Sequence, residues 1–262
     1  MSQTALKACL GRRDSLFHDY TFGEQERKTL DSDGHFVFPG LLTPDAQENL
    51  TRSLSYIHEL SRTPKEEHEP NRFSAEYDSY LESLIAHPQM LKLARQVLGE
   101  DIRYDHCVSL NRPGGNRGIG WHSHGYSDDD PRLGFVRIFF YVNGFDPDDG
   151  GLKAVPGSHL YRDTRIHAQS DEDLREGWLA GKTHPETGEP LEIQALSAPS
   201  GTVALMWTHA AHGVNPRKQD SDTRWCVVYA YRNPGKPSGA RWITPEFERK
   251  SIPGAEGLMS LY

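Results

Sequence analysis

Residues 102–110 alternate strictly between two kinds of side chain, and this alternation limits the folds open to the chain. Ile, Tyr, His, Val and Leu occupy the even positions, and Arg, Asp, Cys and Ser occupy the odd ones. Because successive side chains of a strand point to opposite faces, a period of two predicts a β-strand. Further short strands are predicted over 135–142, 152–155, 201–207 and 224–232, between turns rich in Gly and Pro.

The first hundred residues carry helical signals instead. Thr43 and Pro44, followed by an acid, form a typical helix start, and apolar residues continue at helical spacing to about residue 60. A second helical region is predicted over 79–98, where Pro88 restarts the helix and Gly99 ends it. Helices followed by many short strands predict an α+β protein with a β-sandwich or barrel core, of which a jelly roll fits best.

The length of 262 residues suits a single domain, and we interpret 1–262 in that way. Within it we expect a mainly helical part over 1–100 and a jelly-roll core over 101–232. Polar and poorly periodic residues at about 160–195 are interpreted as an insertion near the site, and 233–262 as a C-terminal tail.

The charge balance and the cysteines exclude some classes of function. The net charge of −8, from 29 basic and 37 acidic residues, argues against nucleic-acid binding. No apolar run approaches the roughly 18 residues of a membrane span, and the start shows no secretory signal. Cys9, Cys107 and Cys226 lie far apart and suit neither a disulfide framework nor a zinc site. A cytoplasmic protein is therefore expected, and its oligomeric state is left open.

Residues 121–125 read Trp-His-Ser-His-Gly and contain the first candidate site. In an extended strand, His122 and His124 would point to the same face and could both bind one metal ion. The alternative is two unrelated surface histidines, because the chain has 13 histidines in all. A third imidazole, His212, follows the strand over 201–207, and Arg224 opens the last strand. Three protein ligands leave open metal positions for catalysis, and a buried arginine requires an anion.

These pieces together resemble the phytanoyl-CoA dioxygenase family of Fe(II)/2-oxoglutarate oxygenases. The resemblance rests on residues 33–40, on the histidine pair in 121–124, on the Gly-Gly-Leu to Pro-Gly-Ser-His segment at 150–159, and on the final His-Gly-Val-Asn-Pro at 212–216 with Arg224. The matching segments extend over about residues 30–232. Each is weak alone, and their order makes the combination specific.

The resemblance implies a fold, a set of cofactors and an activity. The fold is a double-stranded β-helix (a cupin-like jelly roll) with the N-terminal helices packed outside. The cofactors are Fe(II), 2-oxoglutarate as cosubstrate and O2, and the activity is hydroxylation of a small-molecule substrate with release of succinate and CO2. His122 and His212 match the family's metal ligands, and Arg224 matches the arginine that binds the far carboxylate of 2-oxoglutarate. Asn111 is a further candidate for binding the cosubstrate.

The chain departs from the family at His124, where the family has Asp. A site with two histidines and a carboxylate has a net charge of about +1 with Fe(II), whereas three neutral histidines leave about +2. The metal would become a stronger Lewis acid and would be harder to oxidise. His124 could ligate the metal, it could swing away and leave a position for water or halide, or an acid from 128–130 could reach in. We expect ligation by His124, with the three ring nitrogens about 3 to 4 Å apart.

Other residues near these motifs have simpler interpretations. Ser158 and His159 are expected to stabilise a turn, and Trp121 suits core packing as well as a pocket wall. His209 is a rival of His212, but it lies too far from Arg224 in sequence for the family pattern. The acids at 128–130 are most simply a solvated loop.

Two other functions remain open. A three-histidine centre could hold Zn(II) for hydrolysis or an iron that works without 2-oxoglutarate, or the chain could be a non-enzymatic member that only binds a ligand. The substrate is not indicated by any side-chain motif, and the pocket is expected to take its lining chiefly from the loops 62–75, 125–135 and 160–195.

Overall fold

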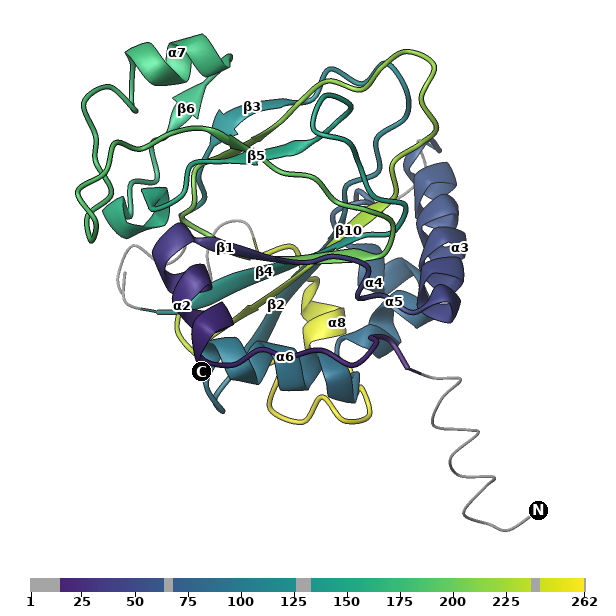
Figure 1. Ribbon diagram of the computed structural model, residues 1–262. Coiled ribbons are helices and arrows are strands. Elements are labelled where there is room, and N and C mark those ends of the chain that lie inside the picture. The colour runs from purple at the N-terminus through teal and green to yellow at the C-terminus, as the bar shows by residue number, and fades with distance from the viewer. Residues whose placement is uncertain (1–14, 64–67, 126–132, 237–240, 262) are drawn as a thin grey trace.

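The computed structural model describes residues 15–63, 68–125, 133–236 and 241–261. Within these residues, two five-stranded antiparallel sheets face each other (Figure 1). The larger sheet has the order β1 (His35–Phe38), β8 (Thr202–Trp207), β4 (Phe135–Tyr141), β10 (Cys226–Arg232) and β2 (Arg103–Ser109). The smaller sheet has the order β6 (His167–Ala168), β3 (Ile119–His122), β9 (His212–Val214), β5 (Leu152–Ala154) and β7 (Gln194–Ala195). This is the predicted jelly roll, and the α+β class is confirmed.

Helices cover the outer face of the larger sheet (Figure 1). They are α2 (Glu24–Asp33), α3 (Pro44–Ser61), α4 (Ser74–Tyr77), α5 (Ser79–Leu84), α6 (Pro88–Leu98) and α8 (Pro245–Glu248). The start of α3 is the one that the sequence predicted, because the hydroxyl of Thr43 accepts a hydrogen bond from the backbone N–H of Ala46. The second helical region forms α5 and α6, which are separated where Pro88 begins the new helix.

The central strands of the larger sheet are buried on both faces. Every residue of β4 and β10 is buried, since helices cover one face and the smaller sheet covers the other. The alternation in β2 therefore does not separate core from solvent. Val108 faces the space between the sheets, and Cys107 packs among the helices.

An irregularity in β2 changes the direction of its side chains. Ala230 of β10 pairs with His106, but the next residue pairs with Tyr104, so Asp105 is an extra, bulged residue. Bulges of this kind redirect neighbouring side chains and are common beside functional sites. Here His106 lines the cavity between the sheets, while Asp105 is fully buried.

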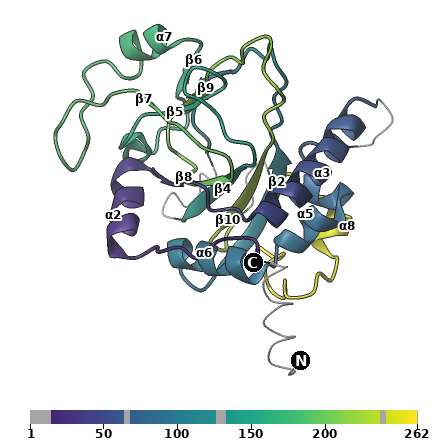
Figure 2. The same cartoon turned by 45° about the vertical axis from the view of Figure 1, so that its right-hand side comes forward.

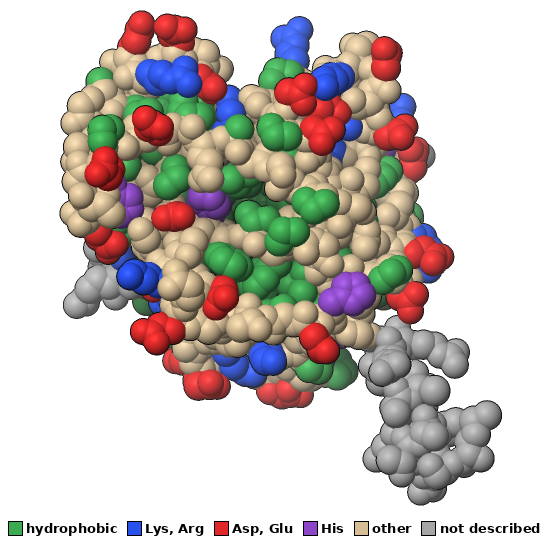
Figure 3. Space-filling model, viewed as in Figure 1, with side chains coloured by type: hydrophobic (Ala, Val, Ile, Leu, Met, Phe, Trp, Pro, Cys, Tyr) green, Lys and Arg blue, Asp and Glu red, His purple; other side chains and the backbone are tan. Residues whose placement is uncertain are grey.

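The segment at 160–195 extends the smaller sheet at both of its edges (Figure 2). It supplies β6 at one edge, β7 at the other and α7 (Asp171–Glu176), and the 3-10 helix η1 (Ser158–Tyr161) precedes it. On the face drawn in Figure 3, a hollow with apolar side chains lies between the two sheets, and charged side chains surround it. No helix among the described residues has the length and apolar character needed to cross a membrane.

Candidate metal centre and its cavity

A cavity of about 290 Å³ lies between the two sheets, close to the lower size limit of small-molecule sites. Its wall on the larger sheet consists of side chains that alternate along β4 and β2. Arg137, Phe139 and Tyr141 of β4 share one face, and they lie across β10 from the inward side chains of β2. The cavity is lined by Asn71, Arg72, His106, Val108, Leu110, Arg112, Ile119, His122, His124, Arg137, Phe139, Tyr141, Leu152, His212, Val214, Arg224, Val228 and Trp242.

Three histidines from the smaller sheet converge in this cavity. His122 ends β3 and pairs directly with His212 at the start of β9, and His124 follows two residues later. One ring nitrogen from each lies within 4.8 Å of the others. This separation is somewhat wider than the expected 3 to 4 Å, and small rotations of the rings would close the difference. The predicted convergence is therefore observed, and ligation by each residue stays a prediction.

Two of the three rings are held in the orientation that a metal ligand needs. The Nδ1 of His122 lies 3.0 Å from the carbonyl oxygen of Gly120, and the Nδ1 of His212 lies 2.9 Å from that of Ala210. Because a carbonyl only accepts, each Nδ1 carries the proton and donates it. Each Nε2 is therefore left with a free lone pair, as in histidines that bind metal through Nε2.

The third ring is held differently. The Nε2 of His124 lies 3.0 Å from the Nη1 of Arg137, and a guanidinium can only donate, so this nitrogen accepts a hydrogen bond. In this arrangement only Nδ1 of His124 is available to a metal. Arg137 is itself positioned by a hydrogen bond of 3.1 Å from its Nε to the hydroxyl of Thr208.

Burial keeps the histidine cluster in its neutral, metal-binding form. Burial lowers the pKa of His122, His124 and His212, and the nearby positive charge of Arg137 lowers these pKa values further. Burial also lowers the pKa of Arg137, to about 10, which still leaves it charged at neutral pH. A metal ion would therefore meet three neutral imidazoles without having to displace protons.

Acid is expected to destabilise the metal-free protein through this cluster. The pKa of each of the three histidines is lower in the folded chain than the ordinary value of 6.5, so the unfolded chain binds more protons below that pH. Their contribution to stability is fully present above pH 6.5 and is lost as the pH falls below it. The melting temperature measured at about pH 7.5 and about pH 5.5 tests this.

A double substitution of His122 and His212 by Gln should make that loss of melting temperature smaller. The matched control is His18→Gln, because His18 is exposed and does not belong to the cluster. An equal pH dependence in wild type and in the double variant would contradict the assignment.

Two arginines form the opposite end of the cavity. Arg224 is 2% exposed and lies beside the rings of Tyr141 and Phe145, 5.5 and 5.7 Å from their centres, and its Nη1 donates to the carbonyl of Gly150. The backbone of Arg112 pairs with that of Arg224. Burial is the main cause, and the nearby charge of Arg224 a second one, that lowers the pKa of Arg112 to about 10. Among the described residues, the Nε atoms of both arginines are buried without an acceptor. This end of the cavity therefore suits an anion.

Asn111 lies next to this end but uses its amide elsewhere. Its Nδ2 donates to the carbonyl of Leu54 at 3.1 Å, and its Oδ1 accepts from the backbone N–H of Cys226 at 3.4 Å. Its neighbour Arg112 lines the cavity instead. Binding of the cosubstrate by Asn111 stays a prediction.

The structure gives Trp121, Ser158 and His159 structural positions. Trp121 is 1% exposed, packs in a small core and donates to Asp171. The hydroxyl of Ser158 accepts from the backbone N–H of Ala211. His159 donates from Nε2 to the carbonyl of Asp31 and lies against α2 so closely that a Cβ on Gly34 would be 2.5 Å from its ring.

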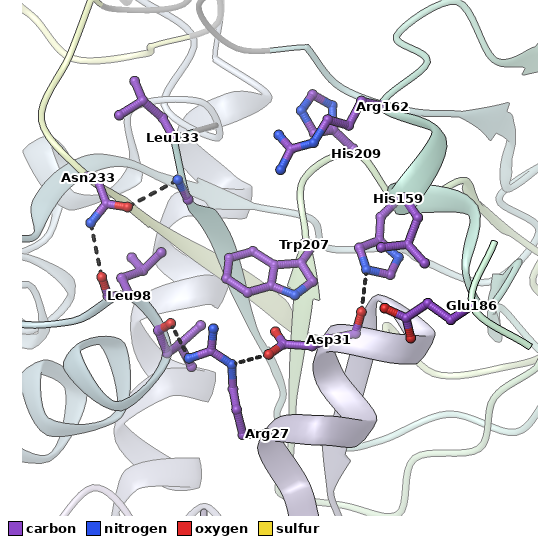
Figure 4. A pocket seen from close by; sticks show the side chains of 13 residues that line it. Arg27, Asp31, Leu98, Leu133, His159, Arg162, Glu186, Trp207, His209 and Asn233 are labelled. Carbon is purple, nitrogen blue, oxygen red and sulfur yellow. Dashed lines mark hydrogen bonds and ion pairs between the residues drawn. The ribbon is translucent and has the colours of Figure 1, made fainter. Parts of the chain in front are cut away.

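His209 lies in a second cavity, of about 450 Å³, between α2, α6 and the turn after η1. Figure 4 shows His209 beside Arg162, with Trp207 next to them, and His159 above Asp31. Burial lowers the pKa of His209 to about 4. His209 is not part of the three-histidine cluster, and the choice of His212 over His209 agrees with this placement.

The structure also brings in residues that the sequence did not single out. Arg72, from the loop expected to line the pocket, lies at the cavity together with Arg112, Arg137 and Trp242. Trp242 belongs to the C-terminal tail, whereas the segment at 160–195 lines the second cavity instead. The acids at 128–130 lie outside the described residues, and so does Cys9.

Comparisons with known proteins agree with this architecture. The family model described as phytanoyl-CoA dioxygenase (PhyH) matches residues 30–224. A curated protein of Stutzerimonas stutzeri, a probable alpha-ketoglutarate-dependent hypophosphite dioxygenase, is 23% identical over 161 residues. That match covers 58% of this chain and 53% of the relative, so it spans only about half of the relative's length.

Solved structures share the fold at low sequence identity. The non-heme alpha ketoglutarate dependent carbocyclase SnoK from nogalamycin biosynthesis superimposes with a TM-score of 0.63 at 14% identity, over 88% of this chain and 92% of that one. HygX from Streptomyces hygroscopicus, solved with nickel and 2-oxoglutarate bound, gives a TM-score of 0.58 at 18% identity, over 88% and 95% of the two chains.

Proposed function

The chain belongs to the phytanoyl-CoA dioxygenase family of Fe(II)/2-oxoglutarate-dependent oxygenases, and on this premise we propose that it hydroxylates a small-molecule substrate, with release of succinate and CO2. One observation carries the proposal. The three histidines and Arg224 line the same cavity. His124 contacts Arg137 in the first half of β4, whereas Arg224 lies beside Tyr141 at the end of β4, so the metal-binding and anion-binding groups lie at different ends of that strand. This order is the one that a metal-chelating dicarboxylate requires.

His122 and His212 are the residues that fit a metal best, because their Nε2 lone pairs are free and their rings are fixed by backbone carbonyls. His124 completes the set through Nδ1, or through Nε2 once Arg137 releases it. When bound, Fe(II) would activate O2 as the oxidant, and 2-oxoglutarate would supply two of the four electrons through its decarboxylation to succinate and CO2.

Arg224 would bind the far carboxylate of 2-oxoglutarate. Its side chain is buried, so the resulting ion pair lies away from water, and a guanidinium can hold both carboxylate oxygens at once. Arg112 adds a second positive charge at this end. The two arginines give the site a preference for a dianion over a monocarboxylate.

Apolar side chains lie between the two ends and would exclude water. Phe139 and Val228 from the larger sheet face Leu152 and Val214 from the smaller one. A dry, fixed wall holds the cosubstrate in one orientation and keeps solvent from the reacting atoms. The protein therefore contributes position and environment, and the cofactors contribute the oxidation.

Anaerobic titration with Fe(II) and 2-oxoglutarate tests the proposal directly. A metal-to-ligand charge-transfer band should appear only when both are present, and succinate should form after O2 is admitted. Zinc bound in place of iron, with no such band and no succinate, would support the hydrolytic alternative and overturn the oxygenase assignment.

A further inference from the structure

The cavity is strongly basic, and 2-oxoglutarate does not account for all of its charge. Arg72, Arg112, Arg137 and Arg224 line it together with four histidines, and its lining contains no acidic side chain among the residues that the structure describes. The two carboxylates of the cosubstrate would meet the metal and Arg224. Arg137 and Arg72 then remain beside the histidines.

Arg137 has a donor left for a ligand. It is 8% exposed, and its hydrogen bonds to other described residues use Nε and Nη1, which leaves Nη2 without a partner among those residues. The buried Asp105 accepts from Nδ1 of His106 at 2.6 Å and lies 3.7 Å from Arg232. Asp105 raises the pKa of Arg137 through space, but it lies outside the cavity lining.

Arg72 stands at the rim of the same cavity. Its guanidinium lies 5.1 Å from the ring centre of Trp242, and Trp242 in turn lies 5.3 Å from the ring of His106. A carboxylate oxygen of Glu69 lies 2.9 Å from Nε of Arg72. The side chain of Arg72 is 47% exposed, so solvent screens this ion pair and Glu69 offsets only part of the positive charge of Arg72. The stack of Arg72, Trp242 and His106 forms one wall of the cavity.

Two acids approach this end from outside the lining, Asp105 at His106 and Glu69 at Arg72, and the lining itself has only basic and neutral side chains among the described residues. A divalent metal at the three histidines would add further positive charge. A cationic group would therefore be repelled, and an uncharged group could accept from Nη2 of Arg137 but would not offset its charge. An anion does both, and it can be shared with Arg72 at the rim.

We propose that the substrate carries a compact anionic group, a carboxylate or a phosphonate, that binds between Arg137 and Arg72 beside the histidine cluster. This assignment rests on the proposed function, because it names the substrate class of the same site. Arg137 donates to the anionic group from inside the cavity, and Arg72 donates to it from the rim. Trp242 packs against the remainder of the substrate.

Calorimetric titration of the full chain loaded with Ni(II) and 2-oxoglutarate tests the site. Methylphosphonate is compared with its uncharged ester, dimethyl methylphosphonate, and propionate with propionamide, so that the two pairs separate a phosphonate from a carboxylate. We expect at least one anion to bind and neither neutral partner to do so. Arg72→Gln and Arg137→Gln should each weaken that binding by about tenfold or more, because each removes a charge-assisted hydrogen bond.

The matched control is Arg165→Gln, since Arg165 is 88% exposed and lies outside the cavity. It should leave the affinity for the anion unchanged. Equal binding of a neutral partner, no binding of either anion, or an affinity that is unaffected by Arg72→Gln would overturn the proposal. The last result would mean that Arg72 does not hold the anion.

Two further outcomes separate this inference from the proposed function. If Arg137→Gln weakens 2-oxoglutarate and leaves the anion unaffected, Arg137 serves the cosubstrate and the anion site is wrong. If 2-oxoglutarate fails to bind while an anion still binds with the same dependence on both arginines, the anion site stands and the oxygenase assignment fails.

Discussion

Lysine in place of Arg224 is expected to weaken the binding of 2-oxoglutarate by about tenfold or more. Nη1 of Arg224 is already used by the carbonyl of Gly150, so the carboxylate would be held by the other donors of the planar fork. A lysine has a single charged head and cannot serve both the carbonyl and two carboxylate oxygens in that geometry. The dissociation constant is read from the charge-transfer band in anaerobic titrations with Fe(II).

The control for this prediction is Arg165→Lys, the same exchange at an exposed position. Circular dichroism should show that Arg224→Lys is folded, because the substitution keeps the positive charge and the apolar stem. The affinity for Fe(II) alone should not change, since Arg224 lies at the other end of the cavity from the histidines. An unchanged affinity for 2-oxoglutarate in the Arg224→Lys variant would count decisively against its role.

The elements that the sequence predicted correctly are those with local signals. The helix after Thr43 follows from a cap and a spacing within one segment, and the strand at 102–110 follows from its period of two. His122 and His124 converge as predicted, but β3 ends at His122, so the strand spacing that predicted a common face does not extend to His124. Their meeting with His212 came from the family pattern, because the pairing of β3 with β9 joins residues about ninety positions apart.

Other site residues had weaker signals or none. Arg137 interrupts an otherwise apolar strand at 135–142, and a charge inside a buried strand is costly unless it faces a partner. That cost is a usable signal that Arg137 faces a buried polar partner. Arg72 and Trp242 come from separate loops, and neither has a local pattern that indicates their contact across the cavity. The bulge at Asp105 depends on pairing with β10 and is likewise invisible in the sequence.

Metal affinity is expected to depend more on His122 and His212 than on His124. Alanine at either of the first two should lower the affinity for Fe(II) on the order of 100-fold or more, because each removes a ligand whose second nitrogen is already fixed by a carbonyl. His124→Ala should lower it by about tenfold, since Arg137 competes for one of its nitrogens. Equilibrium titration against a chelator of known affinity gives all three values.

The substitution His124→Asp restores the family's acid beside Arg137. It separates the role of residue 124 as a metal ligand from the role of Arg137 as its hydrogen-bond donor. The carboxylate can bind the metal and accept from Arg137 with different oxygens, so metal binding should be kept and the centre becomes less positive. For an oxygenase that uses 2-oxoglutarate, succinate formation should be preserved or raised. For zinc chemistry or chemistry without the cosubstrate, turnover should fall and no succinate should appear.

Equal affinities for Fe(II) in wild type and in His124→Ala would sink the three-histidine centre. In that case the hydrogen bond from Arg137 holds His124 away from the metal, and two histidines alone bind it. The position that the family gives to an acid would then be open beside a buried guanidinium, where an anion has both a metal and a donor to bind. Metal affinity in Arg137→Gln, measured with His124 present and in the His124→Ala background, decides between these arrangements. Loss of the positive charge of Arg137 should raise the affinity in both backgrounds, and freeing Nε2 of His124 should add to that rise only if the ring is able to ligate.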